Sequence, residues 1–381
     1  MLPKRWCLWL EIGLTEDRKG VLMRKPKKAV AGQATYAGAG VDIDAGEEFV
    51  ALVRQLIAEA WPEMAEQIGG FAGGAVIPEG IEKIGSGCDG AGTKPLLSVL
   101  AGQLSGSGQD AAAMSLVDAY VGGFRPAFLL DTVKTGKLVP NVHIEIVKGV
   151  IAACKMAGAV LLGGETAEMP GLYRYPWYFD VDTTTIGFAD PALAYAEVQP
   201  GQDIFGWPSG GLGANGLSLA RKILRLTEGP AKTKKRLQRR WPELGGQTLA
   251  EALLVPTPIW IQQAEAQRQQ GVKFAGHAHI TGGGLTNNLP RILPPHLKAR
   301  IFCDSWVRPP IFGLLQRLGN VAQQEMSRTF NNGVMMASIV VTPGPSDPTF
   351  SDQNALRIGQ VVRRDGTEPQ VEFVGQYRDP A

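Results

Sequence analysis

Acidic side chains lie inside two glycine-rich segments of this 381-residue chain. The first segment, 85–94, reads Gly-Ser-Gly-Cys-Asp-Gly-Ala-Gly-Thr-Lys and carries Asp89 and Lys94, while the second carries Glu165 and Glu168 between glycines. Loops of small residues expose backbone N–H groups to phosphate oxygens, and carboxylates are the ligands that Mg²⁺ prefers. We therefore predict a magnesium–nucleotide site built by both segments, in which Lys94 contacts a phosphate.

The small residues of these segments are the predicted contacts to the nucleotide phosphates, together with Glu168. They are Gly87, Gly90, Gly92, Thr93, Gly163 and Gly164. The first segment also matches G-x-G-x-x-G, but no helix opens cleanly at its third glycine, so a dinucleotide site is the weakest interpretation and a surface turn is the plain alternative. If the second segment turns helically, Glu165 and Glu168 share one face. Otherwise they are two exposed acids beside a Pro-Gly turn.

Two histidines come just before a third glycine-rich segment. His277 and His279 are two residues apart, so on a strand they share a face, and His279 is the closer to Thr281-Gly-Gly-Gly284. A histidine beside a backbone anion site suits acid–base chemistry or phosphate binding. A pair of ordinary strand histidines is the alternative.

The composition is that of a globular chain without a strong surface field. Hydrophobic residues make up 44% and charged residues 19% of the chain, and the net charge is +2. This balance argues against disorder and does not indicate a nucleic-acid partner. The densest basic run, 232–240, has no aromatic stacking platform beside it, so we interpret it as a solvated surface loop.

The cysteines and the apolar segments bear on the compartment. The four cysteines, Cys7, Cys88, Cys154 and Cys303, show no paired spacing. That pattern argues against a zinc site or a disulfide framework and favours a reducing compartment. No apolar run approaches the roughly 20 residues that cross a bilayer, and the apolar stretch near the start is shorter than the roughly 7 residues of a secretory signal. We expect a cytoplasmic protein with no membrane partner.

Helical and strand periodicities alternate irregularly along the chain. Asp44 and Glu47 form a predicted capping box for the first helix, and Asn141 is the predicted cap of the second. The pattern predicts helices over 44–60, 141–157, 217–226 and 248–254, and strands over 159–162, 182–188 and 337–341. Because strands and helices do not alternate strictly, we expect an α+β fold rather than a doubly wound sheet.

The chain is long enough for two domains, and the pattern resets near residue 192. We expect a flexible extension over 1–34, a nucleotide-binding domain over 35–192 and a substrate domain over 193–381.

Taken together, the segments resemble the phosphoribosylformylglycinamidine cyclo-ligases, also called aminoimidazole ribonucleotide synthetases. The resemblance runs from about residue 36 to residue 361. In chain order the matching pieces include Tyr36-Ala-Gly-Ala-Gly-Val-Asp-Ile-Asp-Ala-Gly46, Gly87-Cys-Asp-Gly-Ala-Gly-Thr-Lys94, Thr135-Gly-Lys-Leu138, Gly163-Gly-Glu-Thr-Ala-Glu-Met-Pro-Gly171, Asn215-Gly216, Pro256-Thr257, Ala278-His-Ile-Thr-Gly-Gly-Gly-Leu285 and Arg328-Thr-Phe-Asn331.

The resemblance implies an enzyme of purine synthesis that uses ATP and Mg²⁺. Such an enzyme closes formylglycinamidine ribonucleotide, a small-molecule substrate, into 5-aminoimidazole ribonucleotide. ATP phosphorylates the formamide oxygen, the amidine nitrogen attacks the activated carbon, and phosphate leaves. The resemblance also implies a homodimer in which the N-terminal domains form a shared β-barrel, with ATP bound near the interface.

By position, the resemblance assigns roles to individual residues. It makes Asp89, Asp118 and Glu165 metal ligands. The implied catalytic residues are these three together with Lys94 and His279. The implied substrate contacts are Asn215, Thr281, Gly282, Gly283, Gly284, Thr329 and Asn331.

The chain departs from the family's motifs at several positions. Val117 replaces an asparagine, and Gly213 and Ala214 replace a histidine and a serine. Losing a hydrogen-bonding partner costs about 1–3 kcal/mol where the other partner stays buried. A relative that phosphorylates a different small molecule, or a nucleotide-binding protein without catalysis, is therefore the alternative to a cyclo-ligase.

Overall fold

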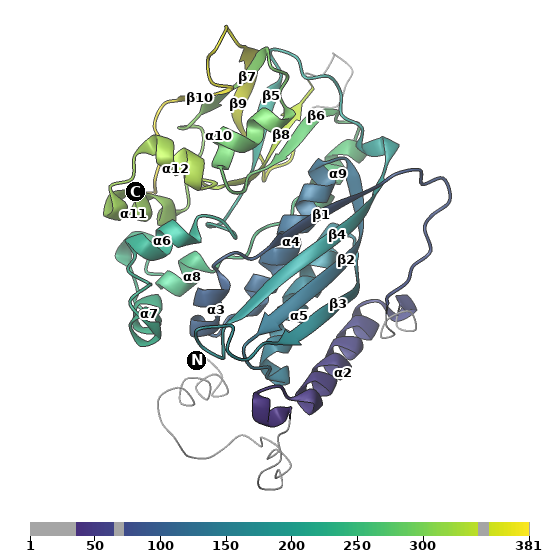
Figure 1. The fold of residues 1–381 in the computed structure, drawn as a ribbon. Coiled ribbons are helices and arrows are strands. Elements are labelled where there is room, and N and C mark those ends of the chain that lie inside the picture. Colours follow the sequence, from purple (N-terminus) through teal and green to yellow (C-terminus); the bar gives the residue numbers. More distant parts are fainter. Residues whose placement is uncertain (1–35, 65–71, 342–349, 381) are drawn as a thin grey trace.

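Two β-sheets organise the chain in a computed structural model that describes residues 36–64, 72–341 and 350–380 (Figure 1). The predicted flexible extension, 1–34, lies outside the described residues. A four-stranded sheet has the order β1-β4-β2-β3 and consists of β1 (Ile84–Gly90), β2 (Phe124–Thr135), β3 (Val160–Glu168) and β4 (Phe179–Ala189).

The second sheet has six strands in the order β10-β7-β9-β5-β8-β6. Each sheet contains one parallel pair, β2 with β3 and β10 with β7, and its other pairs are antiparallel. The strands of the second sheet are β5 (Asp203–Pro208), β6 (Phe274–His279), β7 (Leu297–Phe302), β8 (Val334–Val340), β9 (Leu356–Arg363) and β10 (Val371–Val374). The predicted α+β fold is confirmed.

Helices cover one face of the four-stranded sheet (Figure 1). The helices α4 (Ser105–Val121) and α5 (Pro140–Ala157) pack on the sheet, and α2 (Ile43–Ala60) packs against α5. Helix α4 itself carries small and apolar residues on most of its sides. This composition suits a helix that is buried between the four-stranded sheet and β6 of the second sheet.

The remaining helices are short, and most of them belong to the second half of the chain. They are α3 (Pro95–Ala101), α6 (Leu217–Ile223), α7 (Pro230–Leu237), α8 (Leu249–Leu253), α9 (Ile261–Gln269), α10 (Gly284–Asn288), α11 (Pro310–Gly319) and α12 (Gln323–Thr329), with 3₁₀ turns at Ala37–Ala39, Pro62–Met64, Pro191–Leu193, Pro242–Leu244 and Leu289–Ile292. Among the described residues, no helix has the length and apolar character needed to span a membrane.

A hydrophobic cluster around α4 joins the two halves of the chain. It contains Val117 and Tyr120 of α4 together with Trp207 of β5, Phe274 of β6 and Met336 of β8. Val117, where the resemblance implies an asparagine, is 2% exposed in this cluster. The substitution therefore adds an apolar side chain to the core between the halves. The segment 190–202 connects the two sheets, and the domain boundary between 192 and 193 stays a prediction.

Parts of the two predicted glycine-rich loops are strands instead, whereas residues 91–94 and 169–171 stay outside them. Residues 85–90 belong to β1, and β3 continues through the acidic segment to Glu168. The glycines permit close packing: an ideal Cβ on Gly87 would lie 2.5 Å from the carbonyl oxygen of Ser115, and one on Gly164 would lie 1.8 Å from a carboxylate oxygen of Asp131. A strand also places side chains three residues apart on opposite faces, so Glu165 and Glu168 do not share one.

The helix caps also differ from the prediction. Asp42, not Asp44, caps α2, because its carboxylate accepts from the N–H of Ala45. Helix α5 begins at Pro140 with Val139 in the cap position rather than Asn141, and it ends at Gly158 as predicted. Much of the basic run 232–240, predicted as a loop, belongs to α7.

Candidate functional site

The two halves of the chain meet at an acid–histidine pair. Asp118 lies on α4 of the first half and His279 lies at the end of β6 in the second. The Asp118 Oδ1 atom is 2.8 Å from His279 Nδ1, and the exposed fractions of the two side chains are 44% and 2%. Within the described part of the chain, His279 Nε2 has no hydrogen-bond partner. The structure therefore brings together two predicted catalytic residues, one reaching solvent and one buried.

Asp89 belongs to the same cluster. Burial raises the pKa of Asp89 above its usual value, and the neighbouring carboxylates of Asp118 and Asp182 act in the same direction. The Gly90 N–H, 2.7 Å from Asp89 Oδ1, and His279 lower it. Like charges that share a site repel one another, and a divalent cation bound among these oxygens relieves that repulsion.

Glu165 does not join Asp89 and Asp118. Asp89 lies on β1 and Glu165 on β3, which are the two edge strands of the four-stranded sheet. Neighbouring strands are about 4.8 Å apart, so three strand spacings separate these edges by roughly 14 Å. Among the residues that the structure describes, no three His, Cys, Asp or Glu side chains are grouped to hold a metal ion. The predicted three-carboxylate site is therefore not formed within this chain.

The carboxylate of Glu168, a predicted phosphate contact, is held by the chain's own backbone. Its Oε1 atom accepts from the N–H of Leu138 at 2.8 Å, and its Oε2 atom accepts from the N–H of Asp42. Glu168 thereby ties the cap of α2 to the turn before α5. The structure gives this residue a structural role in place of the predicted one.

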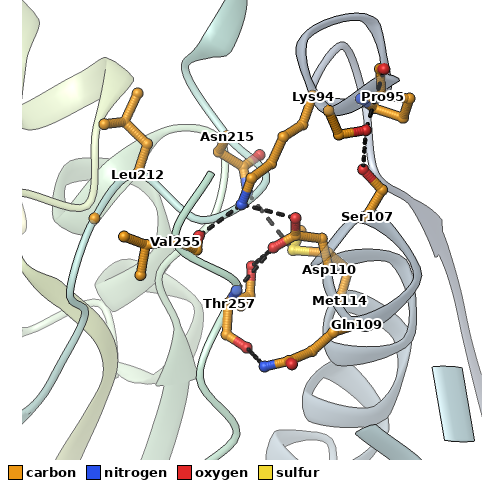
Figure 2. A network of polar contacts seen from close by, with 12 residues as sticks. Lys94, Pro95, Ser107, Gln109, Asp110, Met114, Leu212, Asn215, Val255 and Thr257 are labelled. Atoms are coloured by element: carbon orange, nitrogen blue, oxygen red, sulfur yellow. Dashed lines mark hydrogen bonds and ion pairs between the residues drawn. The ribbon is translucent and has the colours of Figure 1, made fainter. Parts of the chain in front are cut away.

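Lys94 is also placed differently from the prediction. Its Nζ atom lies 2.7 Å from Asp110 Oδ2 and donates to the Val255 carbonyl at 2.6 Å (Figure 2). Burial lowers the pKa of Lys94 below its usual value, although Asp110 opposes this shift. With 1% of the residue exposed, Lys94 presents no amine to a phosphate in this arrangement.

The first glycine-rich segment meets the first turn of α6 and the loop before it across the two halves. The hydroxyl oxygens of Thr93 and Ser218 are 3.4 Å apart. An ideal Cβ on Gly92 would lie 3.4 Å from the carbonyl oxygen of Ala214. The predicted phosphate contacts Gly92 and Thr93 therefore lie beside the predicted substrate loop.

A histidine at position 213 would have a strained backbone in this structure and would need the end of the Met335 side chain to move. Gly213 has a φ of +65°, and an ideal Cβ there would lie 2.6 Å from Met335 Cε and 3.0 Å from Thr257 Oγ1. Met335 and Thr257 therefore occupy the space that a side chain at position 213 would need.

Asn215 lies between α4 and the third glycine-rich segment. Its Nδ2 atom donates to Met114 Sδ at 3.6 Å, as Figure 2 shows. Its Oδ1 atom is 3.6 Å from an ideal Cβ on Gly282. Asn215 and the segment 281–284, both predicted to bind substrate, are thus brought together beside the helix that carries Asp118.

The end of α12 supports these two loops. An ideal Cβ on Gly284 would lie 2.1 Å from the Ser327 carbonyl oxygen, so only glycine allows this approach. Asn331 is 2% exposed and donates to the carbonyl oxygens of Gly211 and Leu212, each at 3.0 Å. Asn331 therefore braces the loop that leads to Asn215 and has little surface for a substrate. The hydroxyl of Thr329 donates to Glu325.

Three polar residues near the site were missed from the sequence. Asp110 pairs with Lys94, and Asp182 pairs with Lys134, which lies on the neighbouring strand β2. Asp182 could have been noticed because it follows Asp180 at strand spacing. Nothing in the spacing of Lys94 and Asp110 indicates their contact.

Comparisons with known proteins cover nearly the whole chain. Two family models match it: "AIR synthase related protein, N-terminal domain" over residues 73–189 and "AIR synthase related protein, C-terminal domain" over residues 199–372. A chloroplastic/mitochondrial phosphoribosylformylglycinamidine cyclo-ligase of Vigna unguiculata is 39% identical over 353 residues, which are 90% of this chain and 86% of the plant protein. A phosphoribosylformylglycinamidine cyclo-ligase of Desulfitobacterium hafniense is 41% identical over 334 residues, covering 86% of this chain and 94% of the bacterial protein.

Solved structures share the fold at low identity. The crystal structure of E. coli HypE matches with a TM-score of 0.55 and 18% identity, over 85% of this chain and 93% of that chain. A thiamine-monophosphate kinase from Stenotrophomonas maltophilia matches with a TM-score of 0.51 and 17% identity, over 85% of this chain and 96% of that chain. These likenesses agree with the two-domain α+β architecture.

Proposed function

Since this chain belongs to the phosphoribosylformylglycinamidine cyclo-ligase family, we propose that it closes formylglycinamidine ribonucleotide into 5-aminoimidazole ribonucleotide with ATP. The observation that carries the proposal is the junction where Asp89, Asp118 and His279 gather beside the loops of Asn215 and 281–284. This junction combines two carboxylates for a nucleotide-bound Mg²⁺, a histidine for proton transfer and two loops for a small substrate.

The reaction consists of two group transfers. The γ-phosphoryl group passes from ATP to the formamide oxygen, which releases ADP and makes that oxygen a good leaving group. The amidine nitrogen then bonds to the activated carbon, the C–O bond to the phosphorylated oxygen breaks, and phosphate departs as the nitrogen loses a proton. Fixed orientation of the two reactants accounts for much of the acceleration in such reactions.

Asp89 and Asp118 are the residues that fit Mg²⁺. The ion usually takes one or two carboxylates from the protein and completes its shell with water and substrate phosphates. Both carboxylates offer oxygen ligands, and the Asp118 carboxylate adds to the burial that raises the pKa of Asp89, so the two side chains suit a cation that arrives with the nucleotide. When bound, Mg²⁺ supplies charge neutralisation on the phosphates.

His279 is the proposed proton acceptor for ring closure. Its Nδ1 atom contacts the Asp118 carboxylate, and its Nε2 atom has no partner in the described part of the chain. If Nδ1–H donates to Asp118, Nε2 is left as the basic nitrogen. The loops of Asn215 and 281–284 lie beside this helix and are the proposed binding surface for the ribonucleotide.

A homodimer is part of the proposal. No helix from the described residues covers the second face of the four-stranded sheet in Figure 1. That face carries apolar side chains, among them Ile84 at 62% exposure and the half-buried Phe128, Leu130 and Ile186. Burying such a face against a second copy removes apolar surface from water. Light scattering of the purified protein, compared with an Ile84→Asp variant, tests this association.

One assay tests the activity. The purified protein is incubated with ATP, Mg²⁺ and formylglycinamidine ribonucleotide, and ADP and 5-aminoimidazole ribonucleotide are measured together. The proposal expects equal amounts of both products. ADP release without the imidazole product contradicts it and indicates a kinase of another small molecule, and ATP binding without turnover indicates a binding protein.

A further inference from the structure

We propose that Lys94, Asp110 and Thr257 form an interdomain pin that positions the two halves of the site, so that Lys94 acts through Asp110 and not by contact with a phosphate. The catalytic part of this inference rests on the proposed function, whereas the existence of the pin does not.

The pin crosses from the first half of the chain to the second. Lys94 directly precedes α3 and Asp110 lies in the second turn of α4, while Val255 and Thr257 belong to the segment between α8 and α9. Lys94 Nζ contacts both sides, 2.7 Å from Asp110 Oδ2 and 2.6 Å from the Val255 carbonyl oxygen (Figure 2). The lysine therefore bridges the two halves.

The second oxygen of Asp110 also crosses the junction. Asp110 Oδ1 accepts from the Thr257 N–H at 2.8 Å and from the Thr257 hydroxyl at 2.7 Å. Next to it, Gln109 Nε2 donates to the Thr257 carbonyl at 3.0 Å. Every polar group of Thr257 thus bonds to the start of α4, which fixes this segment in position and in orientation.

Burial makes the pin sensitive to the loss of any member. The exposed fractions of Lys94, Asp110 and Thr257 are 1%, 0% and 0%. Water cannot solvate a buried charge that has lost its partner. Removing one member of a buried ion pair therefore destabilises a protein far more than removing both. The junction therefore depends on the pair as a unit.

The pin is connected to both halves of the site. Asp110 precedes Asp118 by eight residues on the same helix, a distance of about 12 Å along the axis at 1.5 Å per residue. On the other side, Thr257 Oγ1 lies 3.0 Å from the Cβ position of Gly213, two residues before Asn215. A shift at the pin consequently moves the Asn215 loop relative to Asp118, and misplacement by about 1 Å is enough to cost roughly 10²-fold in rate.

The decisive test compares Lys94→Met, Asp110→Asn and the double variant. Methionine keeps the length of the side chain without its charge, and asparagine keeps an oxygen that accepts from Thr257. We expect each single variant to lower the thermal midpoint, and Lys94→Met to lower kcat of the folded protein by roughly 10²-fold. We expect the double variant to recover most of the thermal midpoint and most of kcat, because no unpaired charge remains. Lys148→Met, with its partner variant Glu145→Gln, removes an exposed pair and serves as the matched control.

Two outcomes of the kinetic measurements overturn the proposal. If Lys94 touches a phosphate, Lys94→Met and the double variant lose activity equally and the KM for ATP rises in both. If the pin is merely structural, the thermal midpoints fall while kcat and KM of the folded fraction stay at wild-type values.

Denaturant unfolding of the four proteins tests the pin separately from the reaction. A coupling between positions 94 and 110 in this double-mutant cycle supports the pin even if the wild-type protein forms no imidazole product, which would refute the proposed function alone. Additive effects of the two substitutions on stability would show that the pin does not exist.

Discussion

The carboxylate of Asp118 and the imidazole of His279 lie 2.8 Å apart although 161 positions separate them in the chain. The contact joins α4 of the first half to β6 of the second. A carboxylate at Nδ1 holds the ring in one orientation and leaves Nε2 to face another group. Because the carboxylate is partly exposed and the ring is buried, one residue can meet an incoming cation while the other stays in a fixed position.

Replacing Asp118 with Asn tests this pair. Asparagine keeps the size and the hydrogen-bonding oxygen but removes the negative charge beside the imidazole of His279. Since acid–base groups typically contribute about 10²–10⁴-fold, we expect kcat to fall by at least 10²-fold. The thermal midpoint should stay near that of the wild type, because the Asp118 side chain is 44% exposed. Joint measurement of ADP and imidazole product checks the rate, and circular dichroism checks the fold.

Asp365→Asn is the control for Asp118→Asn, because Asp365 lies on an exposed turn far along the chain. The control variant should leave kcat and the thermal midpoint unchanged. A kcat for Asp118→Asn within threefold of the wild type would remove Asp118 from the proposed machinery.

Asp89→Asn should impair the use of Mg²⁺–ATP without weakening the fold. A contact to a charged group is worth about 1.5–3 kcal/mol, so we expect the Mg²⁺ concentration for half-maximal ADP release to rise roughly 10- to 100-fold. Burial raises the pKa of Asp89, so its ionised form is disfavoured in the folded protein and asparagine should be at least as stable at neutral pH. Magnesium titrations and urea unfolding measure the two effects. A variant that unfolds while its folded fraction keeps its normal magnesium response would make Asp89 a structural residue.

Sequence pattern predicted the fold class and several elements. It failed at glycines, which occur both in turns and in strands that pack closely against a neighbour. Gly158 ended a helix as predicted, and His277 and His279 lie on a strand as expected. Gly87 and Gly164 were read as loop residues, yet they lie in strands where a carbonyl and a carboxylate approach the backbone. A single chain does not distinguish a glycine that makes a turn from one that makes room for a neighbour.

The site was predicted in part, because its contacts depend on packing between distant segments. Asp118 and His279 were both expected to be catalytic, but their contact follows from how α4 packs against β6. The burial of Lys94 could not be anticipated, since Asp110 lies on a helix of small residues whose neighbours give no indication of a buried charge. The separation of Asp89 from Glu165 depends on strand order, which the spacing of residues does not encode.

Glu168 and Glu165 should differ in their effect on stability. Glu168→Ala removes the acceptor of two backbone N–H groups, so we expect a loss of about 2 kcal/mol in the free energy of unfolding. Glu165 is exposed on the edge strand β3, and Glu165→Ala should change that free energy by no more than about 0.5 kcal/mol. Urea unfolding of the two variants at neutral pH provides the comparison. Equal losses would mean that the two bonds of Glu168 contribute nothing to stability.

Asp131 should make the stability of the protein depend on pH. It lies on β2 with 8% of the residue exposed, and burial raises its pKa from 3.8 to about 7. Between these two values the folded protein retains a proton that the unfolded chain has lost. Stability from this residue is therefore complete below about pH 4 and is lost as the pH rises towards 7.

Asp131→Asn isolates this effect, because asparagine has nearly the same shape and does not titrate. We expect the free energy of unfolding of the variant to rise relative to that of the wild type as the pH rises through that window. At about 1.36 kcal/mol per pKa unit, the difference grows to the order of 4 kcal/mol and then levels off. Urea unfolding at several pH values from 4 to 8 measures the difference, and Asp365→Asn should follow the wild type throughout. Since the carboxylate of Asp131 lies against Gly164, a constant offset between the two curves would reflect packing alone, whereas a difference that closes as the pH rises would show that Asp131 is ionised and stabilised in the folded protein.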